Sequence, residues 1–339
     1  MSRASCLNPR VFIDNTRLQY LESVSFNQSG NSQATSLSVK ANNTLFDGSV
    51  LFGKPISFFL DEGDGVPIFR GFIKDASTSD KSLSISAVDV RGYLSSQSAK
   101  KIKLTDRHNY DGYTLGAFLK EYIDTEININ SIIIGTDKIN ETNPMVSLSG
   151  IRGDFSPLDL VLQNLNKSID ENSSENPLGY NLTVVDDGEK AHIKFSKEKL
   201  NTEPISLSLS ESNGILSYTY KKRPKKFIAN LKEGRYFQYG SAPSGPFSME
   251  LGKIEYDSPD EAREAARLEI LKGLDANVEI SINSSKGYYL DVGDNIYVNV
   301  NDTLLNGVHR VVGKTINYSN KLTCKLQLNK TPSQITRYI

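Results

Sequence analysis

The chain has 339 residues, more than one hydrophobic core usually organises, so two or three domains are expected. Its 39 basic and 40 acidic residues nearly cancel, which gives no net field for nucleic acid or an anionic membrane, and we expect the isolated subunit to bind neither stably. Two cysteines and the absence of any long apolar run argue against a disulfide framework, a cysteine-rich metal site, a signal peptide and a membrane span.

Residues 1–100 alternate apolar and polar side chains, which is typical of strands with one buried face. Turn-forming stretches rich in Gly, Asp, Asn and Ser separate the alternating segments. About six strands are predicted, arranged as a β-barrel or sandwich. The apolar positions of the alternation are Val11, Ile13, Val24, Phe26, Leu37, Val39, Ile56, Phe58, Leu60, Leu83, Ile85 and Ala87.

Residues 101–222 change period and are expected to form a small α+β domain. Apolar residues at helical spacing behind Thr114 predict one helix, and a second is predicted over 156–169. The segment 180–195 alternates on both sides of Asp187-Gly188, which predicts a hairpin. We expect the two helices to cover this hairpin.

Residues 223–339 return to strand alternation, interrupted by one predicted helix over 258–274. Ser258 and Glu261 have the spacing of a capping box at its start. The expected fold class is therefore mainly β with an α+β insert: two related β-barrel-like modules flank a small α+β domain.

An internal repeat supports the relation between the two modules. Residues 53–72 align without a gap over residues 293–312, and the shared framework consists of Gly53, Ile56 and Arg70 with Gly293, Ile296 and Arg310. Coincidence between two unrelated hairpins is the alternative, because any two alternating strands agree in part. If the repeat is real, a trimer presents six similar units in a ring, and these six residues mark its framework or interface.

No residue pattern points to catalysis, a cofactor or a metal, so we expect a non-enzymatic protein. A pair of catalytic carboxylates would leave no fixed local spacing and stays open. The basic run Lys221, Lys222, Arg223, Lys225 and Lys226 is interpreted as a solvated linker or, alternatively, as a contact with a neighbouring subunit.

Two segments resemble the phage tail baseplate hub protein family, which includes T-even-type hubs and late control protein D. The first, 53–94, carries the family's pattern at Pro67, Ile68, Phe69, Gly71, Ile73, Ala87, Asp89 and Leu94. The second, 290–328, is similar to the family's closing module through 293–296 and 307–311.

The resemblance implies a structural hub subunit in the virion tail baseplate, assembled in the host bacterial cytoplasm. Three chains would form a pseudo-six-fold ring that joins the hexameric tail tube to the trimeric central spike. Implied partners are the tube and spike proteins and other baseplate subunits, with the tape measure protein as a further candidate. Two alternatives remain: a tail accessory protein that binds or cleaves cell-surface polysaccharide, and the hub of a non-viral contractile injection particle.

Overall fold

The computed structural model describes the parts of the chain that carry most of the predicted strands. The described residues are 7–29, 34–42, 46–60, 65–79, 82–95, 113–127, 134–139, 180–197, 208–210, 215–220, 227–231, 236–239, 249–263, 278–282, 285–300 and 306–330.

The N-terminal segment folds into an antiparallel sheet, as the alternation predicts. Its strands are β1 (Arg10–Ile13), β2 (Thr16–Arg17), β3 (Leu21–Ser29), β4 (Ser36–Asn42), β5 (Pro55–Phe59), β6 (Phe69–Ser79) and β7 (Ser82–Val88). They are hydrogen-bonded in the order β3-β4-β7-β6-β5-β1-β2. The apolar positions of the alternation are at most 3% exposed and form the core, which confirms that the pattern marked the buried face. A short helix η1 (Gly48–Val50) precedes β5.

Asp89 lies directly after β7 and ties the sheet to helix α1 (Val90–Ser95). Its carboxylate accepts hydrogen bonds from the backbone N–H groups of Thr35 at 3.1 Å and Gly92 at 3.2 Å. The guanidinium of Arg91 donates to the same carboxylate at 2.8 Å and to the Thr35 hydroxyl at 2.8 Å. Both charged side chains are buried, so each compensates for the water that the other has lost.

The C-terminal sheet begins earlier in the chain than expected. Its strands are β10 (Ser208–Ser210), β11 (Ile215–Tyr220), β15 (Val278–Ile282), β16 (Asn295–Asn299), β17 (Gly307–Tyr318) and β18 (Leu322–Lys330). They pair in the order β11-β15-β18-β17-β16-β10. Strands β10 and β11 fall within 101–222, which we expected to form the middle domain, yet they hydrogen-bond to C-terminal strands. A boundary at 222 would therefore separate them from their own sheet.

The two sheets share five strands with the same order and direction. Strands β3, β4, β5, β6 and β7 correspond to β11, β15, β16, β17 and β18. β-bulges recur at matching places, between Leu21 and Ser23 on β3 and Ile215 and Ser217 on β11, and between Ile73 and Asp75 on β6 and Val311 and Gly313 on β17. Bulges are local features that apolar alternation does not specify, so their recurrence argues against coincidence. The outermost strands differ: β1 is antiparallel to β5, whereas β10 is parallel to β16.

The middle segment contains the first predicted helix and the predicted hairpin. Helix α2 (Leu115–Tyr122) begins after Thr114, whose hydroxyl accepts from the Ala117 N–H at 3.1 Å, and continues into a π-helical turn η3 (Ile123–Ile127). The hairpin consists of β8 (Tyr180–Asp186) and β9 (Ala191–Lys197). Gly188 in its turn has a φ of 96°, which glycine adopts without strain. Isolated bridges at Gly135 and Ile139 place the segment 134–139 beside β9.

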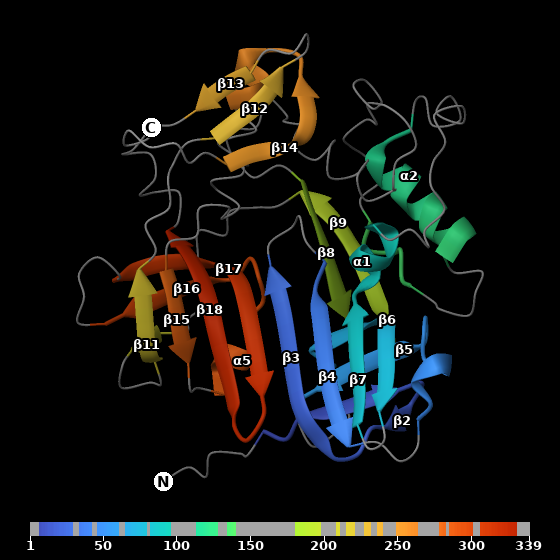
Figure 1. The fold of residues 1–339 in the computed structure, drawn as a ribbon. Helices are drawn as coiled ribbons and strands as arrows, with labels where there is room; N and C mark the ends of the chain where they lie inside the picture. Colours follow the sequence, from blue (N-terminus) through green and yellow to red (C-terminus); the bar gives the residue numbers. More distant parts are fainter. Residues whose placement is uncertain are drawn as a thin grey trace.

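A separate three-stranded sheet is inserted in the chain between β11 and β15. It consists of β12 (Phe227–Leu231), β13 (Tyr236–Tyr239) and β14 (Met249–Tyr256) and lies at the top of the view in Figure 1. After it, the Glu261 N–H donates to the Ser258 hydroxyl at 3.2 Å, as the capping box predicts. The rest of the predicted helix 258–274 and all of the predicted helix 156–169 lie outside the described residues.

Candidate assembly interface

The two modules join through one pair of strands. Strand β3 of the N-terminal module pairs antiparallel with the second half of β17, from Val24 opposite Tyr318 to Ser29 opposite Gly313. Figure 1 shows β3 in blue beside β17 in red, and the two modules thereby form one continuous 13-stranded sheet. We call this pairing the internal seam. It shows how a module of this type can attach to its neighbour through main-chain hydrogen bonds.

Side chains reinforce the internal seam on both faces. On the outer face, the Ser25 hydroxyl donates to the Asn317 side-chain oxygen directly opposite, at 2.7 Å. On the inner face, the ammonium of Lys314 on β17 lies 5.5 Å from the ring centre of Phe26 on β3. Within the N-terminal module, the Phe26 ring lies edge-on to that of Phe69, with centroids 6.3 Å apart. Burying Phe26 alone is worth about 1.5–3 kcal/mol, because its side chain is removed almost completely from water.

Lys314 is a buried cation in this seam. Its ammonium donates to the backbone carbonyls of Tyr288 at 3.3 Å and Leu290 at 2.5 Å, after the short helix α5 (Ser285–Tyr288), and lies 3.4 Å from the Asp291 carboxylate. The carbonyls and the carboxylate replace the water that the charge loses on burial. Nearby, burial raises the pKa of the Cys324 thiol to about 12, so this cysteine remains a neutral core residue.

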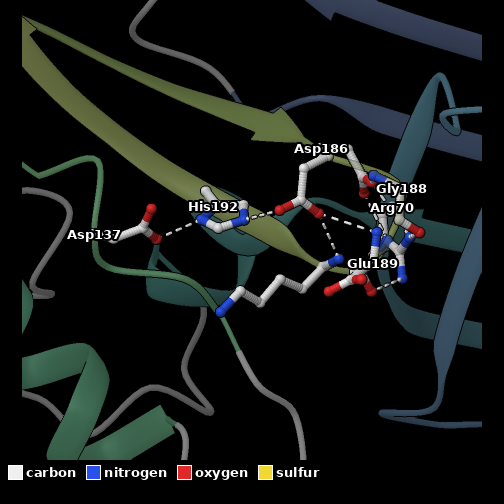
Figure 2. Close-up of polar contacts among 8 residues, drawn as sticks. Arg70, Asp137, Asp186, Gly188, Glu189 and His192 are labelled. Carbon is white, nitrogen blue, oxygen red and sulfur yellow. Dashed lines mark hydrogen bonds and ion pairs between the residues drawn. The ribbon is translucent and has the colours of Figure 1, made fainter.

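Arg70 on β6 connects the N-terminal module to the β8–β9 hairpin (Figure 2). Its guanidinium donates to both carboxylate oxygens of Asp186, at 2.6 and 3.2 Å. It also donates to the backbone carbonyls of Gly188 at 2.9 Å and Glu189 at 3.0 Å. Four donor contacts from one planar group fix both position and orientation, so Arg70 holds the tip of the hairpin against the N-terminal module.

His192 holds the other side of the same hairpin (Figure 2). Its side chain is 4% exposed, with Nδ1 2.6 Å from the Asp137 carboxylate and Nε2 2.6 Å from that of Asp187. Hydrogen bonds from the backbone N–H of Lys190 and from His192 hold the pKa of Asp187 below its usual range, and the bond with His192 lowers the pKa of Asp137. The cluster fastens residues 134–139 to the hairpin.

A cavity of about 190 Å³ lies where the modules and the hairpin meet. Its walls include Phe69 and Arg70 of the first module, Val185 and Asp186 of the hairpin, and Tyr288 and Lys314 of the second. The three parts of the chain therefore meet around the internal seam, where the buried Lys314 and the clamp of Arg70 lie close together.

Replacing Arg70 with alanine is expected to lower the free energy of unfolding by about 1–2 kcal/mol, because four contacts to the hairpin are lost from a partly exposed group. Urea denaturation measures the loss, and hydrogen exchange should rise in residues 186–190. Lys54→Ala removes an exposed ion pair with Asp14 and serves as the control, with little change expected in either measurement. Equal exchange in the two variants would show that Arg70 does not hold the hairpin.

The predicted glycines and isoleucines occupy equivalent positions in the two modules. Gly53 and Gly293 have φ values of 77° and 110°, and each donates its N–H to the long strand behind it at 2.8 Å. The accepting carbonyls belong to Ile73 on β6 and Val311 on β17. Ile56 and Ile296 are 1% and 0% exposed and lie in the core. These isoleucines shape the interior of each module and present no surface to a neighbour.

The predicted arginines do not occupy equivalent positions. Arg70 lies opposite Ser57, whereas Arg310 lies opposite Asn295, two residues further along the corresponding strand. The C-terminal turn is therefore two residues shorter than the gapless alignment assumed. A shift of two leaves the inward and outward alternation unchanged, so apolar matching cannot detect it. Burial lowers the pKa of Arg310 to about 10, in contrast with the partly exposed clamp of Arg70.

Sequence reasoning did not predict Lys314 as a residue of the internal seam. Lys314 lies at an inward position beside Ile316, and a charge within the apolar alternation was the available signal.

The basic run from Lys221 to Lys226, predicted as a linker or a subunit contact, directly follows β11 in the chain and lies outside the described residues.

Two kinds of site are absent from the part of the chain that the structure describes. No group of three or more His, Cys, Asp and Glu side chains in that part of the chain is placed to hold a metal ion. None of the helices described there combines the length and apolarity needed to cross a membrane.

Comparison with solved structures shows the fold of phage tail proteins. The chain is similar to a tail protein from Neisseria meningitidis, with a TM-score of 0.61, 14% identity, and coverage of 94% of this chain and 95% of that one. It is similar to the 43 kDa tail protein of prophage MuSo2 from Shewanella oneidensis, with a TM-score of 0.62, 10% identity, and coverage of 96% and 97%.

A third similar structure comes from a secretion system. It is a component of the E. coli type VI secretion system that exhibits structural similarity to the T4 bacteriophage tail proteins gp27 and gp5. Its TM-score is 0.53 at 12% identity, with coverage of 94% of this chain and 77% of that one. No protein-family model and no curated protein sequence matches the chain.

Proposed function

We propose that the chain is a structural baseplate hub subunit of a phage-type tail and that it assembles as a homotrimer. The observation that carries the proposal is the pair of modules that share five strands, their directions and their bulges. Three such chains supply six similar modules, and a ring of six matches a hexameric tube on one side while its three-fold symmetry matches a trimeric spike on the other. The similarity of fold to tail proteins supports the same role.

The proposed subunit is a scaffold rather than an enzyme. Its proposed location is the baseplate of the virion tail, with the tube protein, the central spike and other baseplate subunits as partners. The division into an N-terminal module, a middle domain and a C-terminal module is part of the proposal, with β10 and β11 counted in the C-terminal module because they pair there.

A hub of a contractile injection particle is the second candidate. The similarity in fold to a type VI secretion component favours it, because that protein also resembles phage tail proteins. Both candidates require the same ring, so they differ in the particle and not in the chemistry of the subunit.

Light scattering coupled to size exclusion tests the proposed function. Either the chain alone is expected to have a mass three times 37.6 kDa, or the complex that it forms with the tube and spike proteins of the same tail is expected to contain three copies of it. End-on particle images of the assembly should show a ring of six lobes. A monomer in every mixture would contradict the proposal.

A further inference from the structure

Each module has two strand edges that can pair with a neighbour: its first strand and the second half of its long strand. The internal seam uses one edge of each kind. At the internal seam, the N-terminal module contributes its first strand, β3, and the C-terminal module contributes the second half of its long strand, β17. The equivalent of β3 in the other module is β11, and the equivalent of β17 is β6. The N-terminal module therefore keeps the edge of its long strand, β6, and the C-terminal module keeps the edge of its first strand, β11.

Both remaining edges have no strand beside them in the described part of the chain. Strand β11 pairs with β15 on one side and ends the sheet on the other. Strand β6 pairs with β5 over Phe69–Phe72, and its second half, Asp75–Ser79, pairs with β7 and with no other strand that the structure describes. Strand β17 is divided in the same way, since its first part pairs with β16 and its second part with β3.

We propose that β11 of one chain pairs antiparallel with the second half of β6 of the next chain, and that this external seam repeats the internal one between copies. The inference rests on the proposed trimer and specifies its interface. The two edges differ, so the contact is head-to-tail, and head-to-tail contacts close into a ring when the rotation per subunit allows it. Internal and external seams then alternate around six modules.

The register of the external seam follows from the internal one. The shared ladders and bulges place Ser25 of β3 in correspondence with Thr219 of β11, and Asn317 of β17 with Ser79 of β6. Ser25 and Asn317 face each other across the internal seam, so Thr219 should face Ser79 of the next chain. Thr219 and Ser79 are both exposed in the single chain.

The exposure of Tyr218 on β11 agrees with this assignment. Its counterpart at the internal seam is Val24, which is 2% exposed, whereas Tyr218 is 38% exposed. A large aromatic side chain beside an open strand edge is a common feature of surfaces that a partner covers. The partner that fits is a second copy, because β6 offers the edge that β17 offers internally.

Cysteine pairs test the external seam in a Cys6→Ser background, in which the buried Cys324 is retained. The pair Ser79→Cys with Thr219→Cys should form links between chains on mild oxidation or with a short bismaleimide, and non-reducing gels should show dimers and trimers. The pair Ser25→Cys with Asn317→Cys is the matched control, because it crosses the internal seam and should link within one chain. Each single-cysteine variant should stay monomeric on the gel.

Charge variants give a second test that does not depend on cysteine geometry. Like charges placed directly opposite each other on paired strands repel, so Ser79→Glu with Thr219→Glu should weaken trimer formation by about tenfold. Ser79→Glu with Thr219→Lys places opposite charges across the seam and should restore it. All three substitutions fall on exposed positions, so circular dichroism should show an unchanged fold.

The outcomes separate the external seam from the proposed function. Links between chains together with a trimeric mass support both, and interchain links in open chains or dimers support the seam but contradict the three-fold ring. A trimer in which the control pair links and the Ser79–Thr219 pair does not would overturn the seam and leave the hub function standing. A monomer in all mixtures, without interchain links, overturns both.

Discussion

Replacing Asp89 with alanine is expected to lower the free energy of unfolding by about 3–5 kcal/mol, since it leaves the buried guanidinium of Arg91 without its carboxylate. The backbone N–H groups of Thr35 and Gly92 lose their acceptor in the same variant. Urea denaturation followed by circular dichroism measures the change.

Two further variants show whether the uncompensated charge causes this loss. Asp89→Ala combined with Arg91→Met removes the charge with its partner and should recover part of the stability. Glu22→Ala breaks the exposed ion pair with Lys40 and should change the unfolding free energy by less than about 0.5 kcal/mol. An Asp89 variant as stable as the Glu22 variant would refute the role of the buried pair.

Gly71→Ala is expected to cost about 3 kcal/mol or more, because the added Cβ would lie 2.2 Å from the carbonyl oxygen of Val88. That oxygen belongs to the backbone of β7, which cannot move without disturbing its ladder with β6. Thermal and urea unfolding check the effect. Gly65→Ala is the control, because a Cβ there meets nothing within 4 Å, and no comparable loss should occur. A Gly71 variant that matched this control would show that the sheet can move apart.

The strands were predictable because burial of one face imposes period two. Leu83, Ile85 and Ala87 lie in the core, as their alternation indicated. The same period leaves the register of the repeat ambiguous, because a shift of two residues matches the alternation equally well. Leu83 is equivalent to Cys324, two residues beyond the Leu322 that alternation aligned with it. Hydrogen-bond ladders and bulges distinguish such registers, and apolar patterns do not.

Sequence reasoning missed the parts of the interface that depend on contacts between distant segments. The predicted middle domain includes β11, whose partner β15 follows only after residues 221–277, and no local signal identifies a partner so far along the chain. Arg70 was predicted as a framework residue, but its contact with Asp186 joins two segments whose proximity only the fold creates. Local patterns specify elements, and tertiary pairing decides which elements meet.

The inserted sheet β12–β14 shows where a module of this type tolerates added structure. It occupies the connection between the first two strands of one module, residues 221–277, where the other module needs only residues 30–35. Both cores depend on their strand ladders, whereas this connection lies outside the ladder that the two strands form. A long segment can therefore be accommodated there without any change in the strand pairing of the module.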